Sequence, residues 1–188
     1  MREGSIPAAA RDAVARYPLC FVASVNDDGS PNLSPKGTVR TWDTDHLVFA
    51  NVASPGTVAN VERDDRVHVN VVDHFARRGW RFVGRARLTR DAAILQALRD
   101  EYPGEEYPFE EAVLVRVEEA QELVSPSYAL GKSEPDLRRE YLELGDAPGA
   151  IPGALGVRAG VICNRCERRP AGSDAVCDEC RVPTEPLR

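Results

Sequence analysis

Alternating apolar and polar residues run through the first two thirds of the chain and predict β-strands. The alternation is clearest at residues 66–72, where three valines fall on one side and a histidine and an asparagine on the other. The sequence predicts six strands, at residues 19–25, 32–41, 46–52, 66–72, 80–88 and 112–124. We interpret the first three as a meander. Strands joined mostly by hairpins favour a six-stranded antiparallel barrel over a parallel doubly wound sheet.

Short helices are predicted between and beside these strands. Ser54 and Asp91 are N-cap residues by type, and Pro55 suits the first position of a helix. The predicted helices cover residues 6–16, 54–62, 91–101 and 134–144. The fold class is therefore mainly β with helices.

The 188 residues are enough for one main domain and a small appendage. We expect the main domain at residues 1–145 and a linker at 146–160, which is rich in glycine, proline and alanine. Residues 161–188 form a separate module in this interpretation. They hold four of the five cysteines of the chain.

Those four cysteines form two C-x-x-C pairs, and they are Cys163, Cys166, Cys177 and Cys180. Two such pairs supply four thiolates, which complete the tetrahedron that zinc prefers and leave no position open for water. The pattern predicts a structural zinc ribbon. Two disulfides or a redox-active pair are the alternatives.

Charge and hydropathy narrow the function classes. The formal net charge of −6 argues against a surface built throughout to neutralise nucleic-acid phosphates, although a local basic pocket stays possible. No apolar run reaches the roughly 18 residues of a membrane span, and the first residues lack the apolar centre of a signal peptide. We therefore expect a cytoplasmic protein with no membrane or nucleic-acid partner.

An anion site is predicted in the main domain. On an extended strand, Lys36, Thr38 and Arg40 would point to the same face. The predicted helix start offers free backbone amides beside the hydroxyls of Ser54 and Thr57, which suits a phosphate. The alternative is that the two basic residues are solvated side chains on an edge strand, and that the two hydroxyls only cap a helix.

The order of several short segments resembles the pyridoxamine 5'-phosphate oxidase-like split barrels, over about residues 17–125. The segments are DGSPNLSPKGT at 28–38, LVFAN at 47–51, SPGT at 54–57 and WRFVGR at 80–85. The resemblance implies a homodimer of six-stranded split barrels with FMN bound at the subunit interface. It implies the following FMN-binding residues: Lys36, Thr38, Val39, Arg40, Ala50, Asn51, Ser54, Thr57 and Arg81.

The chain departs from true pyridoxamine phosphate oxidases in two places. Pro55 and Gly56 stand where those enzymes carry a basic pair, and their C-terminal Arg-x-His element is replaced by the cysteine module. The resemblance therefore implies an FMN-dependent oxidoreductase acting on an unidentified small molecule, not vitamin B6 oxidation. Some relatives of this kind bind a deazaflavin or haem instead of FMN.

Two other function classes stay open. One is a non-catalytic regulatory protein that binds flavin or another ligand and docks a partner through its zinc tail. The other is a zinc-ribbon protein that binds nucleic acid, which the acidic composition disfavours. No catalytic acid, base or nucleophile is assigned: Cys20 is interpreted as a buried core residue, and Asp73 and His74 are kept as candidates for lining a substrate.

Overall fold

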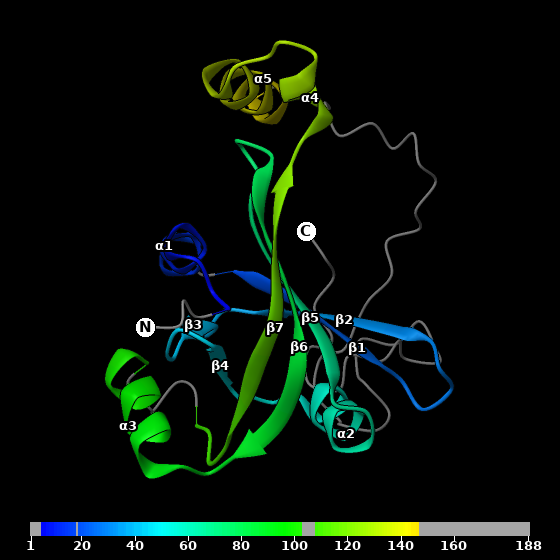
Figure 1. The fold of residues 1–188 in the computed structure, drawn as a ribbon, viewed down its shortest axis with the longest axis vertical. Helices are drawn as coiled ribbons and strands as arrows, with labels where there is room; N and C mark the ends of the chain where they lie inside the picture. Colours follow the sequence, from blue (N-terminus) through cyan, green and yellow to red (C-terminus); the bar gives the residue numbers. More distant parts are fainter. Residues whose placement is uncertain (1–4, 18, 103–107, 147–188) are drawn as a thin grey trace.

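The computed structural model describes residues 5–17, 19–102 and 108–146, which form a curled antiparallel sheet with helices around it (Figure 1). The strands in these residues are β1 (Cys20–Val25), β2 (Pro31–Lys36), β3 (Arg40–Thr41), β4 (His46–Ala50), β5 (Arg66–Asp73), β6 (Arg78–Thr89) and β7 (Ala112–Val124). The helices are α1 (Ala8–Arg16), α2 (Pro55–Arg63), α3 (Ala92–Glu101), α4 (Pro126–Ala129) and α5 (Glu134–Asp146). The predicted class, mainly β with helices, is confirmed. The predicted linker and zinc module lie outside the described residues, apart from residue 146 at the end of α5.

The order of strands across the sheet is β2-β1-β5-β6-β7-β4-β3, and neighbouring strands are antiparallel. The prediction of a single strand at 32–41 is wrong, because the chain leaves the extended ladder at residues 37–39 and β2 and β3 are separate. The sheet therefore has seven strands among the described residues, not six. Both pairings of the predicted meander occur, β1 with β2 and β3 with β4, but they lie at opposite edges of the sheet, so these strands do not form one continuous meander.

The sheet has to curl because its two edge strands are close neighbours in the chain. Only residues 37–39 connect β2 to β3. Four Cα–Cα steps span at most about 14 Å, whereas the edges of a flat seven-stranded sheet would lie about 29 Å apart. Within the described residues, no ladder of hydrogen bonds joins β2 to β3. The result is a half-barrel that is open between its edges, as in a split barrel.

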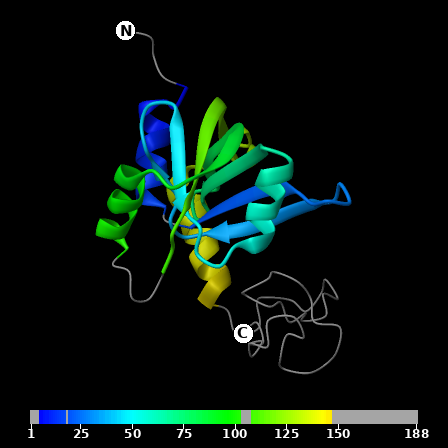
Figure 2. The same ribbon diagram turned by 90° about the horizontal axis from the view of Figure 1, so that it is seen from below.

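Two hydrophobic cores lie on the two faces of the sheet. The main core fills the inside of the curl, where Val69 and Phe82 are fully buried and α1 contributes Ala10 and Val14. The second core lies on the outer face, where α3 covers β4 and β7, and it contains Val48, Ala50, Ile94, Leu95, Leu98, Phe109, Ala112 and Leu114. Figure 2 shows α3 and α2 at opposite flanks of the curled sheet. Burial of β4 on both faces explains its uninterrupted apolar sequence.

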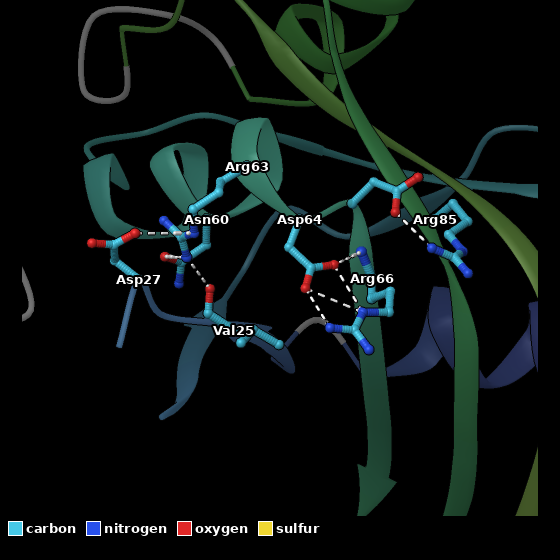
Figure 3. Close-up of polar contacts among 8 residues, drawn as sticks. Val25, Asp27, Asn60, Arg63, Asp64, Arg66 and Arg85 are labelled. Atoms are coloured by element: carbon cyan, nitrogen blue, oxygen red, sulfur yellow. Dashed lines mark hydrogen bonds and ion pairs between the residues drawn. The ribbon is translucent and has the colours of Figure 1, made fainter. Parts of the chain in front are cut away.

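Helix α2 lies against β1 and β6, and polar contacts fix its C-terminal end (Figure 3). Arg63 donates a hydrogen bond to the Val25 carbonyl oxygen at 2.5 Å and pairs with Asp27 at 3.5 Å. Asn60 is buried and donates to Asn26 Oδ1 at 3.0 Å. Two ion pairs follow the helix: Asp64 with Arg66, and Asp65 with Arg85. The contacts of Asn60 and Arg63 hold the C-terminal end of α2 on the β1–β2 hairpin.

Asp73 joins the C-terminal helices to the barrel. Its buried carboxylate accepts hydrogen bonds from the Tyr17 hydroxyl at 2.7 Å, the Ala76 amide at 3.0 Å and the Arg138 guanidinium at 2.5 Å. Burial raises the pKa of Asp73, but these hydrogen bonds outweigh it and lower the pKa below its ordinary value. The neighbouring His74 ring lies against Tyr141 of α5. Asp73 and His74 are thus engaged in holding α5. None of the described helices is long and apolar enough to cross a membrane.

Candidate cofactor site

A hollow of about 310 Å³ lies beside the split between the sheet edges. Its wall is formed by the end of β2, the connection to β3, the end of β4, the loop before α2 and the residue that follows α3. The lining residues are Pro35, Lys36, Gly37, Thr38, Ala50, Val52, Ser54 and Tyr102. Four residues that the sequence had singled out, Lys36, Thr38, Ala50 and Ser54, are therefore brought together.

Lys36 places a cation in the wall of this hollow. It is the last residue of β2 and pairs with Cys20 of β1, so its side chain lies on the inner face of the sheet. The residue is only 6% exposed, and its ammonium group donates to the Ser34 hydroxyl. For Lys36, the alternative of a solvated side chain on an edge strand is therefore wrong. A buried ammonium group is stabilised by polar or anionic partners, and an anion in the hollow would be such a partner.

The start of α2 supplies hydrogen-bond donors on the opposite wall. Ser54 is the N-cap residue, yet its hydroxyl donates to the Val52 carbonyl oxygen at 3.3 Å and caps no amide of the first turn. Thr57, a predicted site residue, does not line the hollow: it is fully buried in that first turn, and its Oγ1 has no hydrogen-bond partner within the described residues. Hydroxyls, first-turn amides and an ammonium group are the donors that a phosphate ester accepts. The donor set of this site fits the phosphate of FMN.

The connection between β2 and β3 is fastened to the end of β4. The Thr38 hydroxyl accepts a hydrogen bond from the Ala50 amide at 3.1 Å. Val39, the next residue, is fully buried in the main core. Its side chain therefore anchors the connection, and any contact that it makes with a cofactor would come from its backbone, as the resemblance implies.

Arg40 lies on the other face of the sheet from Lys36. It pairs with Val48, whose side chain is buried beneath α3 in the second core, so Arg40 points outward. Its Nε donates to Glu101 Oε1 at 2.6 Å. The prediction that Lys36, Thr38 and Arg40 share one face is wrong, because the strand breaks between Lys36 and Arg40.

Asn51 and Arg81 lie outside this hollow. Asn51 follows β4, donates to Glu111 Oε1 at 3.0 Å, and lines an adjacent hollow of about 530 Å³. Arg81 of β6 pairs with Asn70 of β5, which pairs with Phe21 of β1, which in turn pairs with Pro35 of β2. Three strand spacings separate Pro35 from Arg81, or about 14 Å. The structure therefore does not bring Arg81 to the hollow of its own chain.

Four lining residues were not predicted as site residues, namely Pro35, Gly37, Val52 and Tyr102, and of these Tyr102 lies far from the others in the sequence. The residues after α3 were interpreted only as a break in the chain, and nothing in the local pattern links them to residues 35–38. The structure makes the link directly, because the Tyr102 hydroxyl donates to the Gly37 carbonyl oxygen at 3.0 Å. The contact between the end of α3 and the β2–β3 connection joins residues far apart in the sequence, so the hydrophobic periodicity of either segment does not predict it.

The one cysteine in the described residues is Cys20 of β1. Cys20 is fully buried, and burial raises the pKa of its thiol to about 12, which confirms the interpretation of a core residue. The predicted zinc ligands Cys163, Cys166, Cys177 and Cys180 lie outside the described residues. Within the described ranges, no cluster of histidine, cysteine or carboxylate side chains is arranged to bind a metal.

Known structures with this fold include one that is described as an FMN-binding protein. A family model described as pyridoxamine 5'-phosphate oxidase matches residues 6–135. The structure of HupZ from Group A Streptococcus is 27% identical, with a TM-score of 0.58 over 64% of this chain and 95% of that chain. An FMN-binding protein from Syntrophomonas wolfei is 13% identical, with a TM-score of 0.55 over 62% of this chain and 84% of that chain.

A third structure, related to general stress protein 26 and from Clostridium acetobutylicum, is 18% identical, with a TM-score of 0.51 over 62% of this chain and 86% of that chain. At such low identity, the likeness to this structure and to the Syntrophomonas protein shows a shared fold alone. No protein of curated function matches the chain.

Proposed function

The chain belongs to the pyridoxamine 5'-phosphate oxidase family, and we propose that it binds FMN in the hollow at the split and acts as a flavin-dependent oxidoreductase on a small molecule. One observation carries the proposal. Lys36 ends β2 at one edge of the sheet and Ser54 follows β4 near the other edge, yet both line the same hollow. An FMN-binding structure with this fold supports it.

The residues of the hollow divide by chemistry. Lys36, Ser54 and the first-turn amides of α2 would hold the phosphate. Thr57 does not line the hollow, and its buried hydroxyl would gain the partner that it lacks among the described residues if the phosphate enters the first turn of α2. The rest of the wall is largely apolar, with Pro35, Ala50 and Val52, and suits a flat ring system. Bound FMN would supply the redox chemistry by accepting a hydride from one molecule and passing electrons to another. The protein residues bind and orient the reactants.

We further propose that the active unit is a homodimer. Three large apolar side chains are exposed: Leu19 at 56%, Phe21 at 40% and Leu33 at 64%. Phe21 lies on the outer face of β1, and Leu33 lies on the outer face of β2. A second copy on this face would bury these side chains. It would also offer Arg81, which is too far from the hollow of its own chain, a route to the hollow of its partner. A hollow of about 310 Å³ is at the small end of known ligand pockets, about 300–1,000 Å³, which favours completion by a second copy.

The zinc and the compartment remain part of the same proposal. The four cysteines of residues 161–188 would bind one structural zinc per chain, with no role in hydride transfer. A cytoplasmic location is consistent with thiolates that stay reduced.

The first experiment is an absorption spectrum of the purified protein, followed by titration of the flavin-free form with FMN. The chain has two lysines, Lys36 and Lys132, which allow a matched comparison. Lys36→Met is expected to weaken FMN binding by about 10-fold or more, the value of a charged hydrogen bond, whereas the exposed Lys132→Met binds as the wild type does. Wild-type protein that takes up no FMN would refute the proposal.

Turnover separates an enzyme from a regulatory flavin binder. Reduction of the bound flavin by a nicotinamide donor and its reoxidation by an added acceptor, over many cycles, is expected of the oxidoreductase. Flavin that stays bound and is neither reduced nor reoxidised in steady state would favour the regulatory alternative.

A further inference from the structure

Arg40 has a set of contacts that a phosphate-binding residue would not need. Its guanidinium pairs with Glu101 at the end of α3, and the two side chains are 22% and 48% exposed. The same guanidinium lies 4.9 Å from the centre of the Tyr102 ring. The carboxylate of Glu101 offsets the charge of Arg40. The Arg40 side chain is on the outer face of the sheet, away from Lys36.

Tyr102 connects this outer cluster to the hollow. It lines the hollow, its ring meets the Arg40 guanidinium, and its hydroxyl is bound to the Gly37 carbonyl oxygen at 3.0 Å. Gly37 and Thr38 are themselves part of the wall. Two contacts on different sides of the tyrosine therefore fix the direction of its ring relative to the hollow.

We propose that Tyr102 contacts the ring system of the bound flavin and that Arg40 is a positioning residue that holds Tyr102, not a ligand of the phosphate. The inference rests on the proposed FMN function. Tyr102 is the aromatic side chain in the described wall, and an aromatic face is well suited to pack against a flat conjugated ring. Arg40 acts through the tyrosine, by a cation–π contact that the ion pair with Glu101 keeps in place.

Comparison of FMN with riboflavin tests this assignment, because the two ligands share the ring system and differ in the phosphate. A residue that binds the phosphate affects FMN alone, so Lys36→Met is expected to weaken FMN and leave riboflavin unchanged. Tyr102→Leu is expected to weaken both ligands by the same factor, about 10-fold. Arg40→Met should weaken both by about 3-fold, in the pattern of Tyr102.

Fluorescence gives a second measurement that a structural role alone would not change. An electron-rich phenol ring in contact with an excited flavin quenches its emission, so FMN bound to Tyr102→Leu should emit more strongly than FMN bound to the wild type. Tyr102→Phe keeps a ring and loses the bond to Gly37. It is expected to keep the fold, and its affinities for FMN and riboflavin should fall together by less than those of Tyr102→Leu.

The possible failures are distinguishable. Wild-type protein that binds neither FMN nor riboflavin would overturn the flavin proposal and this inference with it. If the wild type binds FMN and Arg40→Met weakens FMN but not riboflavin, Arg40 is a phosphate ligand and this inference alone is wrong. Unchanged affinity and emission in Tyr102→Leu would likewise overturn the ring contact.

Discussion

Replacement of Thr57 by valine should change stability and ligand binding in opposite directions. The two side chains have nearly the same shape, so the substitution exchanges a hydroxyl for a methyl group inside a fully buried position. Thr57 Oγ1 has no hydrogen-bond partner within the described residues. A buried polar group without a partner costs about 1–3 kcal/mol, and we take the lower end for a hydroxyl.

Thr57→Val is therefore expected to raise the unfolding free energy of the flavin-free protein by about 1 kcal/mol. For a chain of this size the midpoint of thermal unfolding should rise by about 2–4 °C. If the FMN phosphate is the missing partner, the variant loses one hydrogen bond in the complex. Its affinity for FMN should fall about 5-fold, which corresponds to about 1 kcal/mol.

Thr41 offers a matched control. Its Oγ1 is also buried without a partner among the described residues, but Thr41 lies on β3, outside the first turn of α2 that would hold the phosphate. Thr41→Val should gain stability by a similar amount and bind FMN as the wild type does. The measurements are thermal unfolding without ligand and fluorescence titration with FMN. A Thr57→Val protein that is less stable without flavin, or that binds FMN with unchanged affinity, would show that the hydroxyl does not serve the phosphate.

Three further predictions concern other parts of the molecule. The pKa of Asp73 is lowered in the folded protein. The ionised carboxylate therefore contributes to folding stability above its unfolded pKa, near 3.9, and this contribution is lost as the pH falls through its folded pKa. Asp73→Asn should lower stability at pH 7 by about 2 kcal/mol, and its acid unfolding curve should be flatter than that of the wild type; an equally steep curve would contradict this. Phe21→Asp should shift the protein towards monomers in analytical ultracentrifugation, and unchanged sedimentation would argue against the proposed dimer face. Metal analysis of the full chain should find one zinc per chain, lost in Cys163→Ser, while the FMN affinity stays the same.

Much of the secondary structure could be predicted because its causes are local. The alternation at 66–72 reappears in β5 as a regular exchange of buried and exposed side chains. Asp91 caps α3 as its residue type predicts, accepting hydrogen bonds from the amides of Ala93 and Ile94. Cys20 is buried as its apolar neighbours indicate. Each of these features depends on residues within a few positions of one another.

The candidate site was predicted only in part. Lys36 and Ser54 were identified by their chemistry, and the structure brings them to one hollow. The side-chain direction of Arg40 was predicted wrongly, because an unbroken strand was assumed across Gly37. Tyr102 was missed, because its contact with Gly37 joins positions 65 residues apart.

By itself, the amino-acid sequence determined most of the strands and helices, because periodicity and capping are properties of neighbouring residues. It also determined the chemical groups available to bind a phosphate. Only the tertiary structure decided that β2 and β3 become opposite edges of one sheet, that Lys36 faces inward and Arg40 outward, and that α3 reaches the connection between them. Those outcomes depend on which strands pair, and strand pairing is set by burial of the whole sheet in two cores.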